Sequence, residues 1–262
     1  MKKELRVFLT AVEFYTRIPC PARVNHSEQY LTESRKFFPV IGWIVGGLSA
    51  LVLYTAQSLF PMHIAILLTL IAGILLTGAF HEDGFADVCD AFGGGFTREK
   101  ILEILKDSRI GAYGAIGITL LLALKYAVLL EISKIDLSTL LLVLIASHSL
   151  SRFVALTLIY THHYVRDDDT AKSRPVVARR SSLSEMVFSF VTGMLPLLFF
   201  KTWWVFMLIV PVYLAKAFLA SYFKKWIGGY TGDCLGATQQ LCEVLFYSSF
   251  LLLWKYLYPQ LL

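Results

Sequence analysis

The chain has 262 residues, of which 56% are hydrophobic and only 16% charged, with a formal net charge of +5 and a mean hydropathy of +0.63. A water-soluble domain of this size would carry about a quarter of charged residues, so the composition excludes an ordinary soluble enzyme. We expect an all-α, polytopic integral membrane protein, with residues 1–262 forming one membrane-embedded domain.

The apolar runs predict about seven transmembrane helices. Before the first run, residues 5–18 have the pattern of an amphipathic helix lying at the membrane interface. Each later run is close to the roughly 20 residues that cross a bilayer, although the fifth is short. The predicted spans are 38–59, 63–80, 110–131, 137–160, 186–200, 203–222 and 241–258.

An acidic motif follows the second predicted span and contains Glu82, Asp83, Asp87 and Asp90. The three aspartates stand at i, i+4 and i+7, so a helix would present them on one face. Like charges this close repel unless a cation lies among them, and clustered carboxylate oxygens suit Mg²⁺. We predict a metal site with all four as ligands, at a membrane surface and acting on phosphates. The other interpretation is a solvated helix start favoured by the helix dipole.

Two motifs after the acidic cluster could bind phosphate. Gly93, Gly94 and Gly95 would let backbone N–H groups point at an anion, although a flexible loop end is equally compatible. Ser108 and Arg109 lie shortly before the third predicted span. An arginine can hold phosphate through two parallel hydrogen bonds, and the alternative is a positively charged anchor at the membrane surface. We predict that all five residues bind substrate.

Four ionisable residues fall inside the predicted spans, namely Lys125, His148, Arg152 and Lys216. Such groups are costly in a membrane and are usually functional or paired. His148 and Arg152 share one face of the fourth span, so we expect them to line an internal cavity. For Lys216, a position at the boundary of its span is the simpler interpretation.

Two later motifs complete the candidate site. Arg174 precedes Pro175 in the 161–185 connection, and we predict that it contacts substrate, although a lipid-headgroup anchor is also compatible. Asp233 lies in a glycine-rich segment before the last predicted span and could ligate a second metal or act as a base. The alternative is a capping residue, because Asp is favoured at helix starts.

Lysines and arginines concentrate in the N-terminal segment and in the connections 81–109, 161–185 and 223–240. The positive-inside rule places these segments in the cytoplasm, so every polar motif would lie on the cytoplasmic face of the cytoplasmic membrane, in contact with membrane lipid. An odd number of spans would leave the C-terminus outside. The basic residues form no stripe with interleaved aromatic residues, so we expect no nucleic-acid partner. The sequence leaves homo-oligomerisation open.

Taken together, these motifs resemble the cobalamin synthase family, the adenosylcobinamide-GDP ribazoletransferases. The resemblance rests on His-x-Asp-Gly-Phe-Ala-Asp-x-x-Asp at residues 81–90 with the glycines at 93–95, and on Asp-Ser-Arg-x-Gly-x-Tyr-Gly at residues 107–114. Residues 39–46, 173–175 and 232–237 support it. The resemblance covers nearly the whole chain.

The resemblance implies a single catalytic domain and a magnesium-dependent phosphotransferase of bacteria or archaea. Its substrates would be adenosylcobinamide-GDP and α-ribazole or α-ribazole 5′-phosphate, and its products adenosylcobalamin or its 5′-phosphate and GMP, in the last steps of cobalamin biosynthesis. Within this reaction, Asp83, Asp87 and Asp90 would hold Mg²⁺ at the pyrophosphate, and Asp233 is the candidate base.

Two alternatives remain open from the sequence. CDP-alcohol phosphotransferases are also polytopic magnesium enzymes, but their motif has Ala-Arg where this chain has Ala86-Asp87. A corrinoid transporter or binding protein would bind without releasing GMP. A transporter would also be expected to place polar groups nearer the middle of the membrane, on broken helices.

Overall fold

The computed structural model describes residues 3–20, 27–165 and 181–257, and within these ranges it contains no β-strand. This confirms the predicted all-α fold. The α-helices are α1 (Lys3–Tyr15), α2 (Glu28–Ser34), α3 (Phe38–Ala56), α4 (Met62–Thr77), α5 (Phe80–Gly94), α6 (Arg98–Ile104), α7 (Ala112–Ile132), α8 (Leu137–Thr161), α10 (Leu183–Met194), α11 (Ile209–Ile227) and α12 (Gly232–Leu257). Three 3-10 helices join them, η1 (Arg35–Phe37), η2 (Leu195–Phe199) and η3 (Trp203–Leu208).

Four helical segments of the described chain are long and apolar enough to cross a membrane. They are Glu28–Ala56, Ala112–Ile132, Leu137–Thr161 and Trp203–Ile227, and the bent pair α4 and α5 raises the number to five if it counts as one span. The chain is therefore polytopic, as predicted, and fewer helices meet this criterion of length and composition than the about seven spans predicted.

The difference lies partly in the fifth and seventh predicted spans. The fifth coincides with α10, which has only 12 residues and continues as η2, where Pro196 lies at the start. The seventh is part of α12, a 26-residue helix that carries several buried polar side chains, among them Gln240 and Glu243, so it is less apolar than a typical lipid-exposed span.

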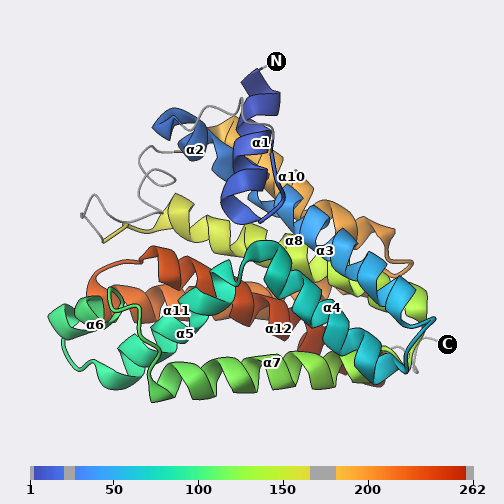
Figure 1. Ribbon diagram of the computed structural model, residues 1–262. Helices are drawn as coiled ribbons and strands as arrows, with labels where there is room; N and C mark the ends of the chain where they lie inside the picture. Colours follow the sequence, from blue (N-terminus) through green and yellow to red (C-terminus); the bar gives the residue numbers. More distant parts are fainter. Residues whose placement is uncertain (1–2, 21–26, 166–180, 258–262) are drawn as a thin grey trace.

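The second predicted span, 63–80, is wrong at its end, because the chain turns by 90° between α4 and α5. Gly78 and Ala79 are both left-handed, with φ of 65° and 59°. Arg17 fixes this corner: its backbone N–H donates to the Leu76 carbonyl at 2.7 Å, and its side chain occupies the space that a Cβ on Gly78 would need. The turn directs the acidic motif on α5 away from the axis of α4 (Figure 1).

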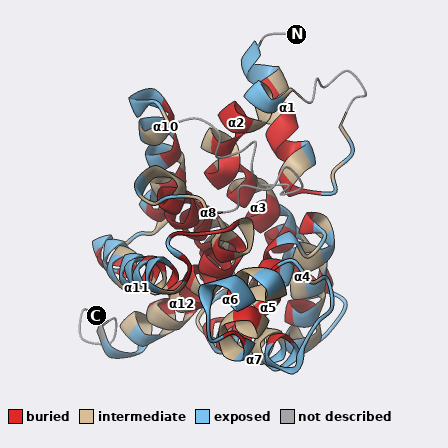
Figure 2. Ribbon diagram, turned by 90° about the vertical axis from the view of Figure 1, so that its left-hand side faces the viewer, coloured by how far each residue is buried: buried red, intermediate tan, exposed pale blue. Residues whose placement is uncertain are grey.

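Helix α8 lies at the centre of the bundle, with most of its residues buried (Figure 2). Helix α3 packs closely against it through two glycines. A Cβ on Gly46 would lie 2.7 Å from Ile145 Cα, and one on Gly42 would collide with the His148 carbonyl. Such a close approach is typical of a Gly-x-x-x-Gly spacing in membrane helices. On the other side of α8, helix α12 packs against α5, α7 and α11 (Figure 1).

Candidate active site

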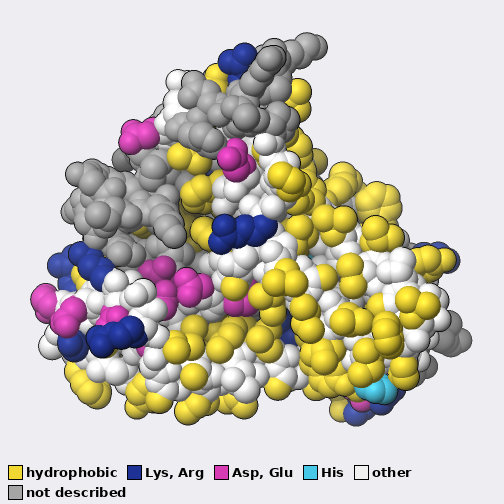
Figure 3. Space-filling view, viewed as in Figure 1, with side chains coloured by type: hydrophobic (Ala, Val, Ile, Leu, Met, Phe, Trp, Pro, Cys, Tyr) yellow, Lys and Arg dark blue, Asp and Glu magenta, His cyan; other side chains and the backbone are white. Residues whose placement is uncertain are grey.

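Asp83 and Asp87 lie one turn apart on α5, which confirms the helical spacing expected from the sequence. The Asp83 side chain is exposed and that of Asp87 is half-buried. Acidic side chains gather on the face of the molecule where α5 is exposed, next to basic side chains (Figure 3). The two carboxylates therefore share a surface that a solvent-borne or membrane-surface substrate can reach.

Asp233 is brought to this surface by two glycines. A Cβ on Gly84 would lie 3.0 Å from the Asp233 carbonyl oxygen, and one on Gly236 would lie 3.2 Å from the His81 carbonyl oxygen. The first turn of α12 therefore packs backbone to backbone against the first turns of α5. The Asp233 carboxylate also accepts a hydrogen bond from Thr231 Oγ1 at 3.2 Å. Three predicted catalytic residues thus come from two helices that touch.

Asp90 has a different role from the one the sequence predicts. Its carboxylate accepts hydrogen bonds from the backbone N–H groups of Gly111, at 2.7 Å, and Gly114, at 2.8 Å. These groups lie at the N-terminus of α7, whose first-turn N–H groups need acceptors. A side chain on Gly114 would collide with the Asp90 carboxylate. Asp90 therefore ties the loop before α7 to α5. Each of its carboxylate oxygens accepts a backbone N–H, so Asp90 has a structural contact that the predicted metal site did not include.

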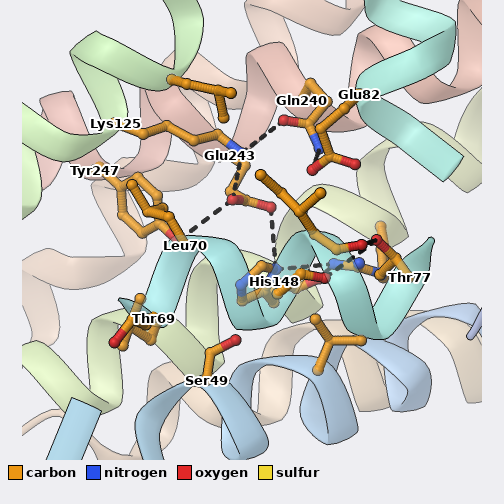
Figure 4. A pocket seen from close by; sticks show the side chains of 16 residues that line it. Ser49, Thr69, Leu70, Thr77, Glu82, Lys125, His148, Gln240, Glu243 and Tyr247 are labelled. Atoms are coloured by element: carbon orange, nitrogen blue, oxygen red, sulfur yellow. Dashed lines mark hydrogen bonds and ion pairs between the residues drawn. The ribbon is translucent and has the colours of Figure 1, made fainter. Parts of the chain in front are cut away.

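Glu82 also differs from the prediction, because it points into a buried cavity instead of toward the exposed aspartates. Its Oε1 accepts a hydrogen bond from Gln240 Nε2 at 2.8 Å (Figure 4). Neighbouring helical positions point about 100° apart, so Glu82 and Asp83 face different surroundings. We remove Glu82 from the set of metal ligands.

Packing explains two of the three glycines at the end of α5. A Cβ on Gly93 would lie 2.7 Å from Cγ of the Tyr113 ring, and one on Gly95 would lie 2.6 Å from the Ile101 side chain. Gly94 is exposed. The run therefore lets the segment before α7 and helix α6 approach α5, and its predicted contact with phosphate stays a prediction.

Ser108 and Arg109 lie exposed in the loop between α6 and α7. The Arg109 guanidinium, 87% exposed, forms an ion pair with Asp107 at 2.6 Å. Hydrogen bonds from Arg109 lower the pKa of Asp107 to about 2, so this pair is ionised near neutral pH. Because Asp90 holds Gly111, the loop that carries Arg109 is tethered to the acidic helix. Arg174, the other predicted substrate-binding arginine, lies outside the described residues.

A cavity of about 20 Å³, room for a single water-sized molecule, lies beneath the acidic surface. His148 and Arg152 line it, which confirms the sequence-based prediction, and Arg152 Nη1 lies 3.1 Å from His148 Nδ1. Glu243 Oε1 pairs with Lys125 Nζ at 2.6 Å, and Glu243 Oε2 lies 3.0 Å from His148 Nδ1 (Figure 4).

The sequence singled out Lys125 but not its partners on α12. Lys125 Nζ also contacts Gln240 Oε1 at 2.6 Å, and Gln240 in turn binds Glu82. The spacing of Gln240 and Glu243 along α12 is a helical signal for one buried polar face. The network joins α7, α8 and α12 to the helix that carries the aspartates. Lys216 is buried as well, and its Nζ donates to Thr161 Oγ1 at 3.1 Å.

Among the described residues, no three His, Cys, Asp or Glu side chains converge to enclose a metal ion. Mg²⁺ rarely needs such a cage, since proteins usually hold it by one or two carboxylates while waters and substrate phosphates complete its shell. Asp83 and Asp87, one turn apart on an accessible face with Asp233 on the adjoining helix, supply hard oxygen donors of this kind. The residues therefore fit Mg²⁺, with fewer protein ligands than predicted.

Comparison with known proteins agrees with this arrangement of motifs. The family described as cobalamin-5-phosphate synthase matches residues 7–251. The chain is 44% identical over 245 residues to the adenosylcobinamide-GDP ribazoletransferase of Shewanella frigidimarina, covering 94% of each chain. It is 42% identical over 255 residues to the protein of the same name from Shewanella amazonensis, covering 97% of this chain and 98% of that one. No solved structure matches. The chain belongs to the cobalamin-5-phosphate synthase family.

Proposed function

We propose that this chain transfers the cobinamide-phosphate group of adenosylcobinamide-GDP to α-ribazole or α-ribazole 5′-phosphate, producing adenosylcobalamin or its 5′-phosphate and GMP. Membership of the family and the names of the relatives support this reaction. The structural observation that carries it is the contact of Gly84 with the backbone of Asp233, which joins the aspartate face of α5 to a third aspartate. Such a surface suits a pyrophosphate donor.

We further propose that the reaction depends on Mg²⁺ held by Asp83 and Asp87, with Asp233 alongside. When bound, the ion supplies positive charge that neutralises the pyrophosphate and stabilises the leaving GMP. The carboxylates orient the donor so that its phosphorus faces the acceptor. Arg109, exposed on the loop tethered to α5, would bind non-bridging phosphate oxygens through its guanidinium.

In the bond-changing step, a ribazole hydroxyl oxygen bonds to the phosphorus that remains with the cobinamide. The bond from that phosphorus to the bridging oxygen breaks, and GMP leaves with that oxygen. The hydroxyl proton passes to a carboxylate, for which Asp233 is the candidate because its backbone packs against the helix that carries Asp83 and Asp87. Thr231 donates to Asp233 Oδ2, which orients the carboxylate.

The reaction is tested with purified protein in lipid nanodiscs, adenosylcobinamide-GDP, α-ribazole and Mg²⁺. We expect GMP and the joined cobalamin product in equal amounts, with neither formed when the acceptor is omitted. Binding or uptake of corrinoid without GMP release would instead support a transporter or binding protein. Turnover of a CDP-alcohol donor in place of adenosylcobinamide-GDP would support the other phosphotransferase class.

The orientation of the site toward the cytoplasm is also part of the proposal, and the charge distribution of the connections supports it. Single cysteines at Phe96 and Lys225 should then react with impermeant thiol reagents only after the cells are opened, in a background without the four native cysteines. A cysteine at Lys201, in a short connection, should react in intact cells. Labelling of Phe96→Cys in intact cells would overturn the orientation.

A further inference from the structure

A second and larger cavity lies at the end of the bundle away from the acidic surface. It has a volume of about 410 Å³, within the roughly 300–1,000 Å³ typical of small-molecule sites. It lies between the turn that joins α7 to α8, the turn that joins η2 to η3, and the last turns of α12. Since α7 has 21 residues, this cavity is about 30 Å from the loop that carries Arg109.

Aromatic rings form one side of the cavity wall. Trp204 packs against Phe250 and Trp254, with ring centroids 5.8 and 6.4 Å apart, and Phe200 lies 5.8 Å from Phe250. On the outer surface beside these rings, Trp203 is 76% exposed and Phe199 64% exposed. Aromatic side chains gather at the level of the lipid headgroups in membrane proteins, so this end of the bundle suits the interface.

One residue of the cavity wall carries a buried hydrogen-bond donor with no partner among the described residues. Trp204 is 3% exposed, and its Nε1–H contacts no acceptor among the described residues. A buried N–H group without an acceptor costs about 1–3 kcal/mol, so native proteins usually satisfy it. The surrounding rings cannot supply an acceptor oxygen. The donor therefore favours an occupant that carries one.

Two opposite charges line the same cavity. Lys201 makes no ion pair within the described part of the chain, and Asp136 comes from the other turn. Asp136 caps α8, and its bonds with Thr139 N and Ser138 Oγ both end on Oδ1. Oδ2 stays available to a cation. An occupant with a negative and a positive group would match this pair, whereas a purely anionic occupant would be repelled by the Asp136 carboxylate.

From this geometry we propose that the cavity binds a zwitterionic phospholipid. The phosphate interacts with Lys201 Nζ and Trp204 Nε1–H, and the headgroup ammonium interacts with Asp136 Oδ2. The acyl chains continue from the aromatic wall onto the exposed apolar surface. This site is separate from the transfer reaction and does not depend on it.

The test is lipid retention by native mass spectrometry after delipidated protein in detergent is mixed with phosphatidylethanolamine or phosphatidylglycerol. Wild-type protein should retain phosphatidylethanolamine at least about fivefold more than phosphatidylglycerol. Lys201→Gln and Trp204→Phe should each lower the retention of phosphatidylethanolamine at least about threefold, because both residues contact the phosphate, while the control Lys134→Gln should leave it unchanged. Lys134 is exposed at the same end of the bundle and pairs only with Glu131 on the surface.

A further variant separates binding from folding. Asp136→Asn keeps a residue favoured as a helix cap, so the protein should remain folded, but it removes the carboxylate that opposes an anion. Phosphatidylglycerol retention should then rise relative to phosphatidylethanolamine. Equal retention of both lipids by the wild type, or wild-type retention of phosphatidylethanolamine in folded Lys201→Gln and Trp204→Phe, would overturn the proposal.

Discussion

Gly84 of α5 lies against the backbone of Asp233 in α12, so close that a Cβ atom on Gly84 would be 3.0 Å from the Asp233 carbonyl oxygen. A backbone neighbour cannot rotate away as a side chain can. The distance between the aspartates of α5 and Asp233 therefore depends on the absence of a side chain at position 84. This contact assembles the proposed active site from two parts of the chain far apart in sequence.

Replacing this glycine should damage catalysis more than folding. Gly84→Val should force α5 and α12 apart and lower the rate of GMP release at least about tenfold, equivalent to about 1.4 kcal/mol of transition-state stabilisation. Gly47→Val is the matched control, because no atom lies within 4 Å of a Cβ placed there. Wild-type turnover in Gly84→Val would show that this helix contact does not set the site.

Asp90 should prove structural. Asp90→Ala removes the acceptor of two backbone N–H groups before α7 and should lower the free energy of unfolding by about 1–3 kcal/mol. Denaturation in detergent measures this loss. Glu131→Ala, which breaks only an exposed ion pair with Lys134, should change stability by less than about 0.5 kcal/mol. A fully stable Asp90→Ala protein that has lost its Mg²⁺ response would return Asp90 to the metal ligands.

The buried pair of Lys125 and Glu243 should be strongly coupled. Lys125→Met leaves the Glu243 carboxylate buried without one of its cations, and loss of one partner of a buried pair costs about 3–5 kcal/mol. Unfolding free energies of Lys125→Met, Glu243→Gln and the double variant form a double-mutant cycle. We expect a coupling energy of at least about 1 kcal/mol. Additive effects of the two changes would contradict the pairing.

Arg109 should contribute through its planar guanidinium and not only through its charge. Arg109→Lys should lower kcat/KM for adenosylcobinamide-GDP about tenfold, while KM for α-ribazole changes little. A membrane-surface anchor needs only positive charge. If Arg109 were such an anchor, the Arg109→Lys substitution would leave kcat/KM unchanged. The control Lys100→Gln removes an exposed charge that pairs with Glu103 in the same region. Unchanged kinetics with both substrates in Arg109→Lys would leave the anchor as the explanation.

Features that depend on helical period alone could be predicted from the sequence. Asp83 and Asp87 share a face of α5, and His148 and Arg152 line one cavity, because residues four apart on a helix are neighbours. The all-α membrane fold followed from the long apolar runs. These are local properties, and one segment of sequence contains all the information they require.

Partners between helices could not be predicted in this way. The capping role of Asp90 depends on where α7 begins relative to α5, and the pairing of Lys125 with Glu243 depends on how α7 packs against α12. Nor does an alanine signal a turn: the left-handed conformation of Ala79 arises where two helices meet at 90°. A pattern read from one segment of sequence contains no information on such contacts between segments.

The central claim is that Asp83 holds Mg²⁺ for the transfer of the cobinamide-phosphate group. The direct measurement is GMP release as a function of Mg²⁺ concentration, after treatment with a chelator, in the wild type, Asp83→Asn and the exposed control Glu99→Gln. We expect release to require Mg²⁺ in the wild type and the control, and to fall about a hundredfold or more in folded Asp83→Asn, about 2.7 kcal/mol. Wild-type rates and Mg²⁺ dependence in Asp83→Asn would contradict the account.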